Sequence, residues 1–216
     1  MCNLYSMTST HDAMRQLFRF RPRQLNVPSM PTIFPSQDAP VVRQSDGERE
    51  LVIMSWGFVL PQGDKAPKRI TNARDDKVAG SPFWRSSFEA RQCLVPATSF
   101  AEYHPTEKHH GRKAAVWFAL KGDEPRPLFA FAGLWRSWRG NLKGERVEMD
   151  VVAFLTTTPN AIVKPIHPNR MPVILKREDH DTWLTGTPEQ ALGLTAPYPA
   201  DEMQIVYTGE TKDEAA

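Results

Sequence analysis

The stretch QCLVPATSFAEY, residues 92–103, decides the fold that this sequence predicts. It is rich in residues that favour strands. Four more strand-like runs follow it in direct succession: AAVWFAL (114–120), PLFAFAGLW (127–135), VEMDVVAFLTTT (147–158) and MPVIL (171–175). Strands that do not alternate with helices favour an α+β fold with a mostly antiparallel, partly closed β-sheet, rather than a doubly wound nucleotide-binding fold.

The segments on either side of these runs predict a few short flanking helices and one hairpin. Helix-start residues and apolar spacing indicate helices over residues 9–20, 81–90 and 187–194. Two strands, VVR (41–43) and ELVIMSWGF (50–58), are expected to form a hairpin around Ser45-Asp46-Gly47. The proline-rich segment that precedes them is expected to be an extended loop.

Length and composition limit the classes of protein to consider. The chain has 216 residues, of which 40% are hydrophobic, and this suffices for one domain. We expect a single domain over residues 1–216, frayed at about 210–216. No signal peptide or membrane-spanning run is evident, so a soluble, cytoplasmic monomer is expected. We find no G-x-G-x-x-G, P-loop, C-x-x-C or H-E-x-x-H motif, and we expect neither a cofactor nor a metal.

Cysteine is the second residue of the chain. If Met1 is removed, Cys2 carries an α-amine beside its thiol. The pKa of an α-amine is near 7.8, so roughly a seventh of it is uncharged at pH 7 and can attack a carbonyl group. Cys93 is the other cysteine, and its apolar surroundings predict a buried strand residue.

The formal net charge is only +2, but basic residues are clustered. Arg19, Arg21 and Arg23 fall in RFRPRQ, and a second cluster falls in residues 65–77. Such clusters are found both in solvated faces and in local phosphate-binding grooves.

Three motifs place polar residues in strand-like surroundings: TNAR (71–74), SFAEY (99–103) and IHPNRMP (166–172). Each motif also has an ordinary structural explanation. Asn72 would close a turn, Glu102 would be an exposed residue at the end of a strand, and His167 would cap a loop. Together with Cys2, they also supply a carboxylate, an imidazole and a carboxamide for the proton transfers by which an amine condenses with an aldehyde. The thiol then closes a thiazolidine ring on the imine.

These motifs resemble the SRAP (SOS-response-associated peptidase) family, which processes abasic sites in single-stranded DNA. The resemblance covers nearly the whole chain in the family's order: Met1-Cys2, Ala39-Pro40, Trp56-Gly57-Phe58, TNAR, CLVPATSFAEY, FAGLW, the LTT run and IHPNRMPVIL. It implies a cytoplasmic protein that joins the nucleoid when it binds damaged DNA.

The resemblance also implies residue roles. Cys2 would form the thiazolidine, Asn72 would orient the sugar or the Cys2 backbone, Glu102 would shuttle protons and His167 would act on the sugar hydroxyl. The implied DNA contacts are Arg74, Pro40, Trp56, Thr156 and Arg170, with an apolar or aromatic surface at Pro40 and Trp56 that stacks on a base.

The chain departs from the family's pattern at three places. Asn3 and Leu4 replace the usual Gly-Arg, so a basic DNA contact is missing at position 4. F-A-E-Y replaces F-Y-E-W around Glu102. The IHPNRMP motif is one residue longer than the usual I-H-x-R-M-P, which affects the position of Arg170.

Two other functions are consistent with parts of this sequence. N-terminal-nucleophile amidotransferases also begin Met-Cys and use the α-amine as the base for the thiol. A non-covalent single-strand-binding module would use the arginines together with exposed Trp56, Trp135 and Trp138. A covalent adduct that depends on Cys2 would distinguish abasic-site chemistry from both.

Overall fold

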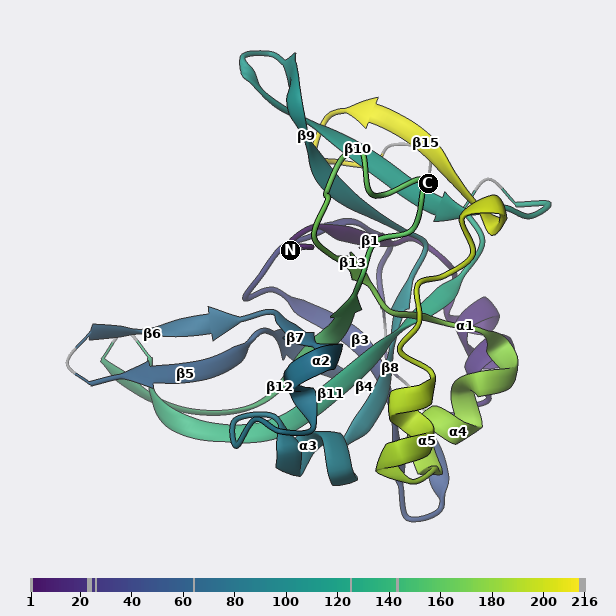
Figure 1. Ribbon diagram of the computed structural model, residues 1–216. Coiled ribbons are helices and arrows are strands. Elements are labelled where there is room, and N and C mark those ends of the chain that lie inside the picture. Colours follow the sequence, from purple (N-terminus) through teal and green to yellow (C-terminus); the bar gives the residue numbers. More distant parts are fainter. Residues whose placement is uncertain are drawn as a thin grey trace.

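The structure is a computed structural model that describes residues 2–22, 25, 27–63, 65–124, 126–142 and 144–213. Curved strands form its body, and short helices are packed around them (Figure 1). The mostly antiparallel, partly closed α+β fold expected from the sequence is confirmed. No helix in the described ranges has both the length and the apolar character needed to cross a membrane.

Five strands close into a small barrel. β12 pairs with both β4 and β11, and the ring is completed through β3 and β8. Only the β12–β4 contact within this ring is parallel. The five strands are β3 (Asp38–Ser45), β4 (Glu48–Trp56), β8 (Gln92–Ala97), β11 (Phe129–Leu142) and β12 (Glu145–Thr157).

A second sheet of five antiparallel strands lies beside the barrel, in the order β15-β10-β9-β1-β2. Its strands are β1 (Tyr5–Met7), β2 (Met30–Ile33), β9 (Ser99–His109), β10 (Arg112–Leu120) and β15 (Met203–Gly209). β2 was missed in the segment that we expected to be a loop. Its proline is tolerated because β2 is the edge strand of the sheet.

The stretch 92–103 is shared between the two sheets. It breaks at Thr98, so that β8 belongs to the barrel and β9 to the second sheet. Ser6 in β1 fixes this break, since its hydroxyl lies 3.1 Å from that of Thr98 and 2.7 Å from that of Ser99. One run of sequence therefore joins the barrel to the sheet that holds the N-terminal segment.

The remaining five strands lie outside the five-stranded ring. β5 and β6 form a separate hairpin that projects from the body (Figure 1), and β7, β13 and β14 pair with the ends of β12 and β11. Their bounds are β5 (Phe58–Gln62), β6 (Lys65–Ile70), β7 (Asn72–Arg74), β13 (Met171–Pro172) and β14 (Ile174–Leu175).

The helices are short, and the three that the sequence predicts are present as α1, α3 and α5, whereas η1, α4 and η2 were not predicted. The N-cap Thr10 accepts a hydrogen bond from Ala13 N at 3.2 Å, and the first helix ends at Phe18 because Arg19 takes a left-handed conformation. α2 was not predicted, and α3 starts at Arg85 because a turn follows Ser81. The helices are α1 (His11–Phe18), α2 (Asp75–Val78), α3 (Arg85–Ala90), η1 (Arg177–Asp179), α4 (His180–Thr185), α5 (Pro188–Gly193) and η2 (Ala200–Glu202).

The core is continuous through the barrel and carries a cluster of aromatic rings. The ring of Trp56 stacks on Phe154, Phe154 stacks on Phe131, and Tyr5 meets all three edge-on. Each of the four side chains is completely buried. Cys93 is also completely buried, in β8, as the sequence predicts.

The C-terminal segment is fixed as far as the structure describes it, so the expected fraying is wrong for residues 210–213. The carboxylate of Asp213 accepts two hydrogen bonds from Arg126, each 2.8 Å long, and one of 2.5 Å from Ser99. The side chains of Asp213 and Arg126 are 1% and 9% exposed. A bidentate ion pair thus attaches this end to the β10–β11 connection, and the Ser99 hydrogen bond attaches it to β9.

We expect Asp213→Ala to lower the free energy of unfolding by about 3–5 kcal/mol, because it leaves the buried Arg126 guanidinium without its carboxylate. Urea unfolding of both proteins measures the difference. Asp201→Ala is the matched control, since Asp201 is exposed and its removal should change stability by less than about 0.5 kcal/mol. Equal effects of the two substitutions would show that the ion pair is not stabilising.

Candidate functional site

Cys2 lies in the segment that leads into β1. β1 pairs with β9 through Tyr5 and Phe100, and Ala101 N donates a hydrogen bond of 2.9 Å to Leu4 O. Continuing this antiparallel register by one residue places Asn3 opposite Glu102. The Cys2 side chain is 1% exposed, and its Sγ donates to Leu4 O at 3.4 Å. The fold therefore brings the aminothiol residue to the Glu102 end of this strand pair.

Position 4, where a basic residue is absent, has a structural role in this chain. Leu4 is 1% exposed and packs in a small apolar cluster with Ala101, Ala115 and Trp117. Its side chain holds the N-terminal segment against the second sheet.

Glu102 is a buried carboxyl group with an incomplete set of hydrogen bonds. It is 5% exposed, and its Oε1 has no hydrogen-bond partner within the described ranges. Burial raises the pKa of Glu102 to about 7, although the charge of the N-terminal amino group acts in the opposite direction. A carboxyl group with this pKa can both accept and donate a proton at neutral pH.

The thiol of Cys2 responds to the same surroundings. Burial raises its pKa well above the ordinary value, and the negative charge of Glu102 raises it further. The thiol is therefore protonated at neutral pH, so it needs a base before it can act as a nucleophile. Glu102 is the carboxylate that lies near enough to affect it.

Asn72 begins β7, which pairs in parallel with the end of β12. The hydroxyl of the preceding Thr71 lies 3.0 Å from Asn3 Oδ1 and 3.3 Å from Asn72 Oδ1. Asn72 is 5% exposed, and its Nδ2 has no hydrogen-bond partner among the residues that the structure covers. Thr71 thus links Asn72 to the N-terminal segment and leaves the amide NH₂ group available as a donor.

His167 lies in the loop between β12 and β13. Its Nδ1 accepts a hydrogen bond of 3.2 Å from Arg170 N, so in the neutral ring the proton is on Nε2. Burial lowers the pKa of His167, and the charge of the N-terminal amino group lowers it further. The ring is therefore neutral at pH 7.

Two arginines at this end of β12 share an acidic partner. Arg74 binds both carboxylate oxygens of Asp76, at 2.9 and 2.6 Å. Arg170 binds Asp75 and Asp76, each at 2.6 Å. The Arg74 side chain is 47% exposed, whereas that of Arg170 is 12% exposed, so Arg74 is the more accessible cation. These ion pairs hold the Asn72 strand and the His167 loop together.

The other expected DNA contacts are internal. Trp56 is completely buried and its Nε1 donates to Thr71 O at 3.2 Å, so the expectation that it stacks on a base is wrong. Pro40 is also buried, in β3 opposite Ile53, and offers no stacking surface. Trp135 and Trp138 are half-buried against the core rather than exposed. Thr156 is buried and its hydroxyl donates to Ala73 O at 3.4 Å, which supports the β7–β12 pairing.

Comparisons with known proteins show the family of the chain. A family model described as SOS response associated peptidase (SRAP) matches residues 1–210. The chain belongs to the SRAP family. The resemblance noted in the sequence is thereby confirmed over nearly its whole length.

Two relatives of this SRAP chain come from Bacillus subtilis. Abasic site processing protein YoaM is 29% identical over 212 residues, which cover 94% of this chain and 89% of the relative. Abasic site processing protein YobE is 29% identical over 215 residues, which cover 94% and 92%.

Solved structures have the same fold. A crystal structure of a protein from Bordetella bronchiseptica is 25% identical, with a TM-score of 0.71 and coverage of 94% of this chain and 97% of that one. A protein from Bacteroides thetaiotaomicron is 22% identical, with a TM-score of 0.72 and coverage of 94% and 90%.

Sequence reasoning missed Thr71, Asp75 and Asp76 as parts of this SRAP site. Asp75 and Asp76 directly follow the TNAR motif, and two acidic residues beside an expected phosphate contact were the available signal. The sequence carries no signal for the role of Thr71, because that role depends on the position of Asn3, which is distant in sequence.

One group of residues in the described ranges could hold a metal ion, and it is separate from the Cys2 site. The ligand atoms of His109, His110 and Glu210 lie within 4.8 Å of one another at the β9–β10 turn. His109 pairs with Arg112 and Glu102 pairs with Val116, so the two residues are separated by four residues of β10, or about 13 Å at the usual rise per residue.

The raised pKa of Glu102 predicts a pH-dependent cost to stability. The unfolded carboxyl group ionises near 4.5 and the folded one near 7, so the wild type loses stability as pH rises between these values. Glu102→Gln cannot ionise. We expect it to be more stable than the wild type at pH 8, by on the order of 2–3 kcal/mol relative to their difference at pH 4.

Urea unfolding at pH 4 and pH 8 measures this change. Glu89→Gln is the matched control, because Glu89 is exposed on α3, and its difference from the wild type should be similar at both pH values. A pH-independent difference for Glu102→Gln would show that the Glu102 carboxyl group ionises as readily in the folded protein as in the unfolded chain.

Proposed function

We propose that this SRAP protein processes abasic sites in single-stranded DNA by forming a thiazolidine crosslink through Cys2 after Met1 is removed. The observation that carries the proposal is the buried Glu102 carboxyl group, which has a pKa of about 7 and an Oε1 atom without a partner in the described structure. Its charge also raises the pKa of the Cys2 thiol. The names of the Bacillus subtilis relatives supply the substrate class.

The first chemical step is imine formation. The uncharged α-amine of Cys2 attacks C1′ of the ring-opened deoxyribose, whose aldehyde becomes a carbinolamine. Glu102 in its acid form donates a proton to the departing hydroxyl group, and water leaves. The Nδ2 group of Asn72 and the Nε2 proton of neutral His167 are the donors for the sugar oxygens.

The second step closes the ring. Glu102, now a carboxylate, accepts the thiol proton, and Cys2 Sγ adds to C1′ of the protonated imine, whose C=N electron pair returns to the nitrogen while the nitrogen keeps its one proton. The overall reaction joins aldehyde and aminothiol with loss of one water. The product is a five-membered ring, which converts a reversible imine into a stable adduct.

The phosphate contacts come from the basic end of β12. Arg74 is the more exposed of the two arginines that Asp76 holds. A DNA phosphate that competes with Asp76 for its guanidinium group would bind bidentately. Single-strand binding should weaken with added salt, with each such contact contributing about −0.7 to the log–log slope.

Two accessory activities are part of the proposal. The Cys2 amine requires removal of Met1, either by an aminopeptidase or by the chain itself, as the peptidase name of the family suggests. The imine intermediate also labilises the C2′ proton of the sugar. Weak strand scission by β-elimination therefore competes with thiazolidine closure.

A denaturing gel tests the proposal. Met1-free protein is mixed with a single-stranded oligonucleotide carrying one abasic site, and a heat-stable shifted band is the expected result. The control oligonucleotide has its abasic aldehyde reduced to the alcohol with borohydride beforehand and should give no band. A band of equal intensity with the reduced oligonucleotide would show that the aldehyde is not the reacting group.

A further inference from the structure

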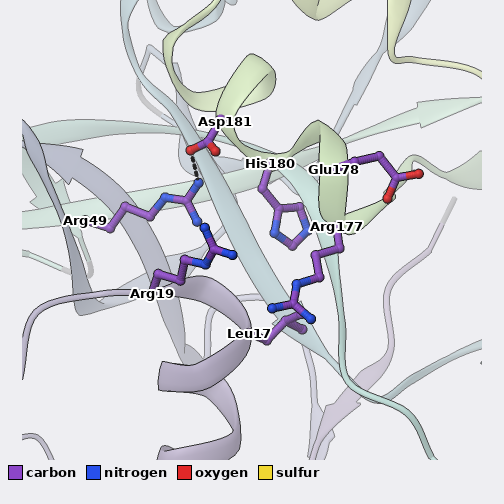
Figure 2. A pocket seen from close by; sticks show the side chains of 7 residues that line it. All are labelled: Leu17, Arg19, Arg49, Arg177, Glu178, His180 and Asp181. Atoms are coloured by element: carbon purple, nitrogen blue, oxygen red, sulfur yellow. Dashed lines mark hydrogen bonds and ion pairs between the residues drawn. The ribbon is translucent and has the colours of Figure 1, made fainter.

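A second group of cationic side chains lies at the opposite end of β4 from Trp56. Arg49 is seven residues from Trp56, so the two are about 23 Å apart along the strand. Trp56 contacts Thr71 and Tyr5 near the Cys2 site, whereas Arg49 faces α1 and α4 (Figure 2). The Arg49 end is therefore a separate region of the molecule.

A cavity of about 310 Å³ opens at this end. Its polar lining comes from the end of α1, from β4, from η1 and from the start of α4. In Figure 2 the side chains of Arg19 and Arg49 lie on one side of the imidazole of His180, with Arg49 turned toward Asp181, and the side chain of Arg177 ends below the ring, whereas Glu178 points away. Three guanidinium groups thus line one cavity.

The charges in the cavity are only partly compensated. Arg49 pairs with Asp181 and also donates to Phe18 O at 2.7 Å. The guanidinium groups of Arg19 and Arg177 make no hydrogen bond or ion pair with any other described residue. Two cations therefore face the cavity without a carboxylate partner.

His180 supplies a buried polar atom. The residue is 3% exposed, and its Nδ1 has no hydrogen-bond partner in the described part of the chain. Burial and the positive charges of Arg49 and Arg177 lower the pKa of His180 to about 4, against the opposing effect of Asp181. The ring is neutral at pH 7, and it can place its single N–H on Nδ1 as a donor to an anion.

We infer that this cavity binds the phosphate group of a small phosphorylated molecule. Arginine forks match the geometry of phosphate oxygens, and the exposed Arg19 and Arg177 stand beside the side chains of the buried His180 and the largely buried Arg49. RFRPRQ, in which Arg19 lies, was recognised in the sequence as a phosphate-binding candidate. Its Arg23 lies outside the described residues.

The surroundings favour a small ligand over a nucleic-acid strand. Glu178 and Asp181 line the cavity and Glu202 lies in the adjoining one, so a long polyanion would meet like charges on both sides. The adjoining cavity of about 290 Å³ shares Arg177 and His180 and has an apolar end formed by Leu128, Phe129, Leu175 and Tyr198. A phosphomonoester with a ring-shaped or apolar body, such as a nucleoside monophosphate, fits both parts.

NMR titration of the ¹⁵N-labelled, full-length protein tests the inference. Inorganic phosphate and deoxyadenosine monophosphate should both shift the resonances of residues 17–19 and 177–181 in a saturable way, and the nucleotide should bind more tightly. Arg177→Ala and Arg19→Ala should each weaken binding by about tenfold or more. Arg15→Ala is the matched control on α1, because Arg15 is exposed outside the cavity, and it should leave binding within about twofold of wild type.

Three results would overturn the inference. The first is the absence of saturable shifts with either phosphate ligand. The second is equal shifts with chloride at matched ionic strength, which would mean general charge screening. The third is tighter binding of a 5′-phosphorylated oligonucleotide than of the free nucleotide, which would assign the cavity to nucleic acid. Thermal unfolding of each variant confirms that a loss of binding is not a loss of fold.

Discussion

Cys2→Ser should abolish the heat-stable crosslink to abasic single-stranded DNA. Serine keeps the α-amine after removal of Met1, so an imine can still form, but it has no thiol to close the thiazolidine ring. We expect the yield of heat-stable adduct to fall below detection on a denaturing gel. Treatment with borohydride during the reaction should restore a band, because reduction traps the imine.

Cys93→Ala is the matched control for this experiment. Cys93 is the other cysteine of the chain and is completely buried in β8, so its replacement should leave the crosslink unchanged. A heat-stable adduct formed equally well by Cys2→Ser would contradict the thiazolidine. A protein that binds abasic DNA but forms no adduct with or without borohydride would be a non-covalent binding module.

Glu102→Gln should slow crosslinking by about 10²- to 10³-fold, because it removes the group that transfers protons in both chemical steps. The wild-type rate should rise with pH up to about neutrality as the α-amine loses its proton, and it should fall above that as Glu102 loses the acid form that donates to the departing hydroxyl group. The variant should lack this fall. Single-turnover gel assays from pH 5 to pH 9 measure both effects.

The Glu89→Gln variant again provides the control, and its rate and pH profile should match the wild type. A Glu102→Gln profile that keeps the fall above neutrality would assign that ionisation to another group, and Glu102 would then have no role in proton transfer. Hydrolysis of glutamine by the wild type, combined with no adduct, would instead favour the amidotransferase chemistry.

The sequence predicted the sheet architecture because its strand signals are local. Apolar runs, the Asp46-Gly47 turn and the capping residues Thr10 and Thr187 each specify structure within a few residues. The position of each strand in the sheets was not predictable in this way. The split of residues 92–103 at Thr98 depends on Ser6, which lies more than ninety residues away in sequence.

The same distinction applies to the candidate site. Cys2, Asn72, Glu102 and His167 were chosen for side-chain chemistry, and each has a buried or half-buried setting in the structure. Trp56 was expected to present an exposed ring to DNA, but its side chain is completely buried. The error arose because an aromatic residue in a strand gives no local sign of which face of the sheet is buried. The pairing of Arg74 and Arg170 through Asp76 is likewise a tertiary feature.

The intact mass of the protein–DNA adduct tests the central claim most directly. Met1-free protein is reacted with a short abasic oligonucleotide, and the intact mass of the product is measured by mass spectrometry before and after borohydride treatment. The account predicts a mass equal to the sum of the two reactants less one water, unchanged by borohydride because a thiazolidine has no C=N bond to reduce. An adduct that gains two hydrogens on treatment, or an adduct that retains Met1, would contradict it.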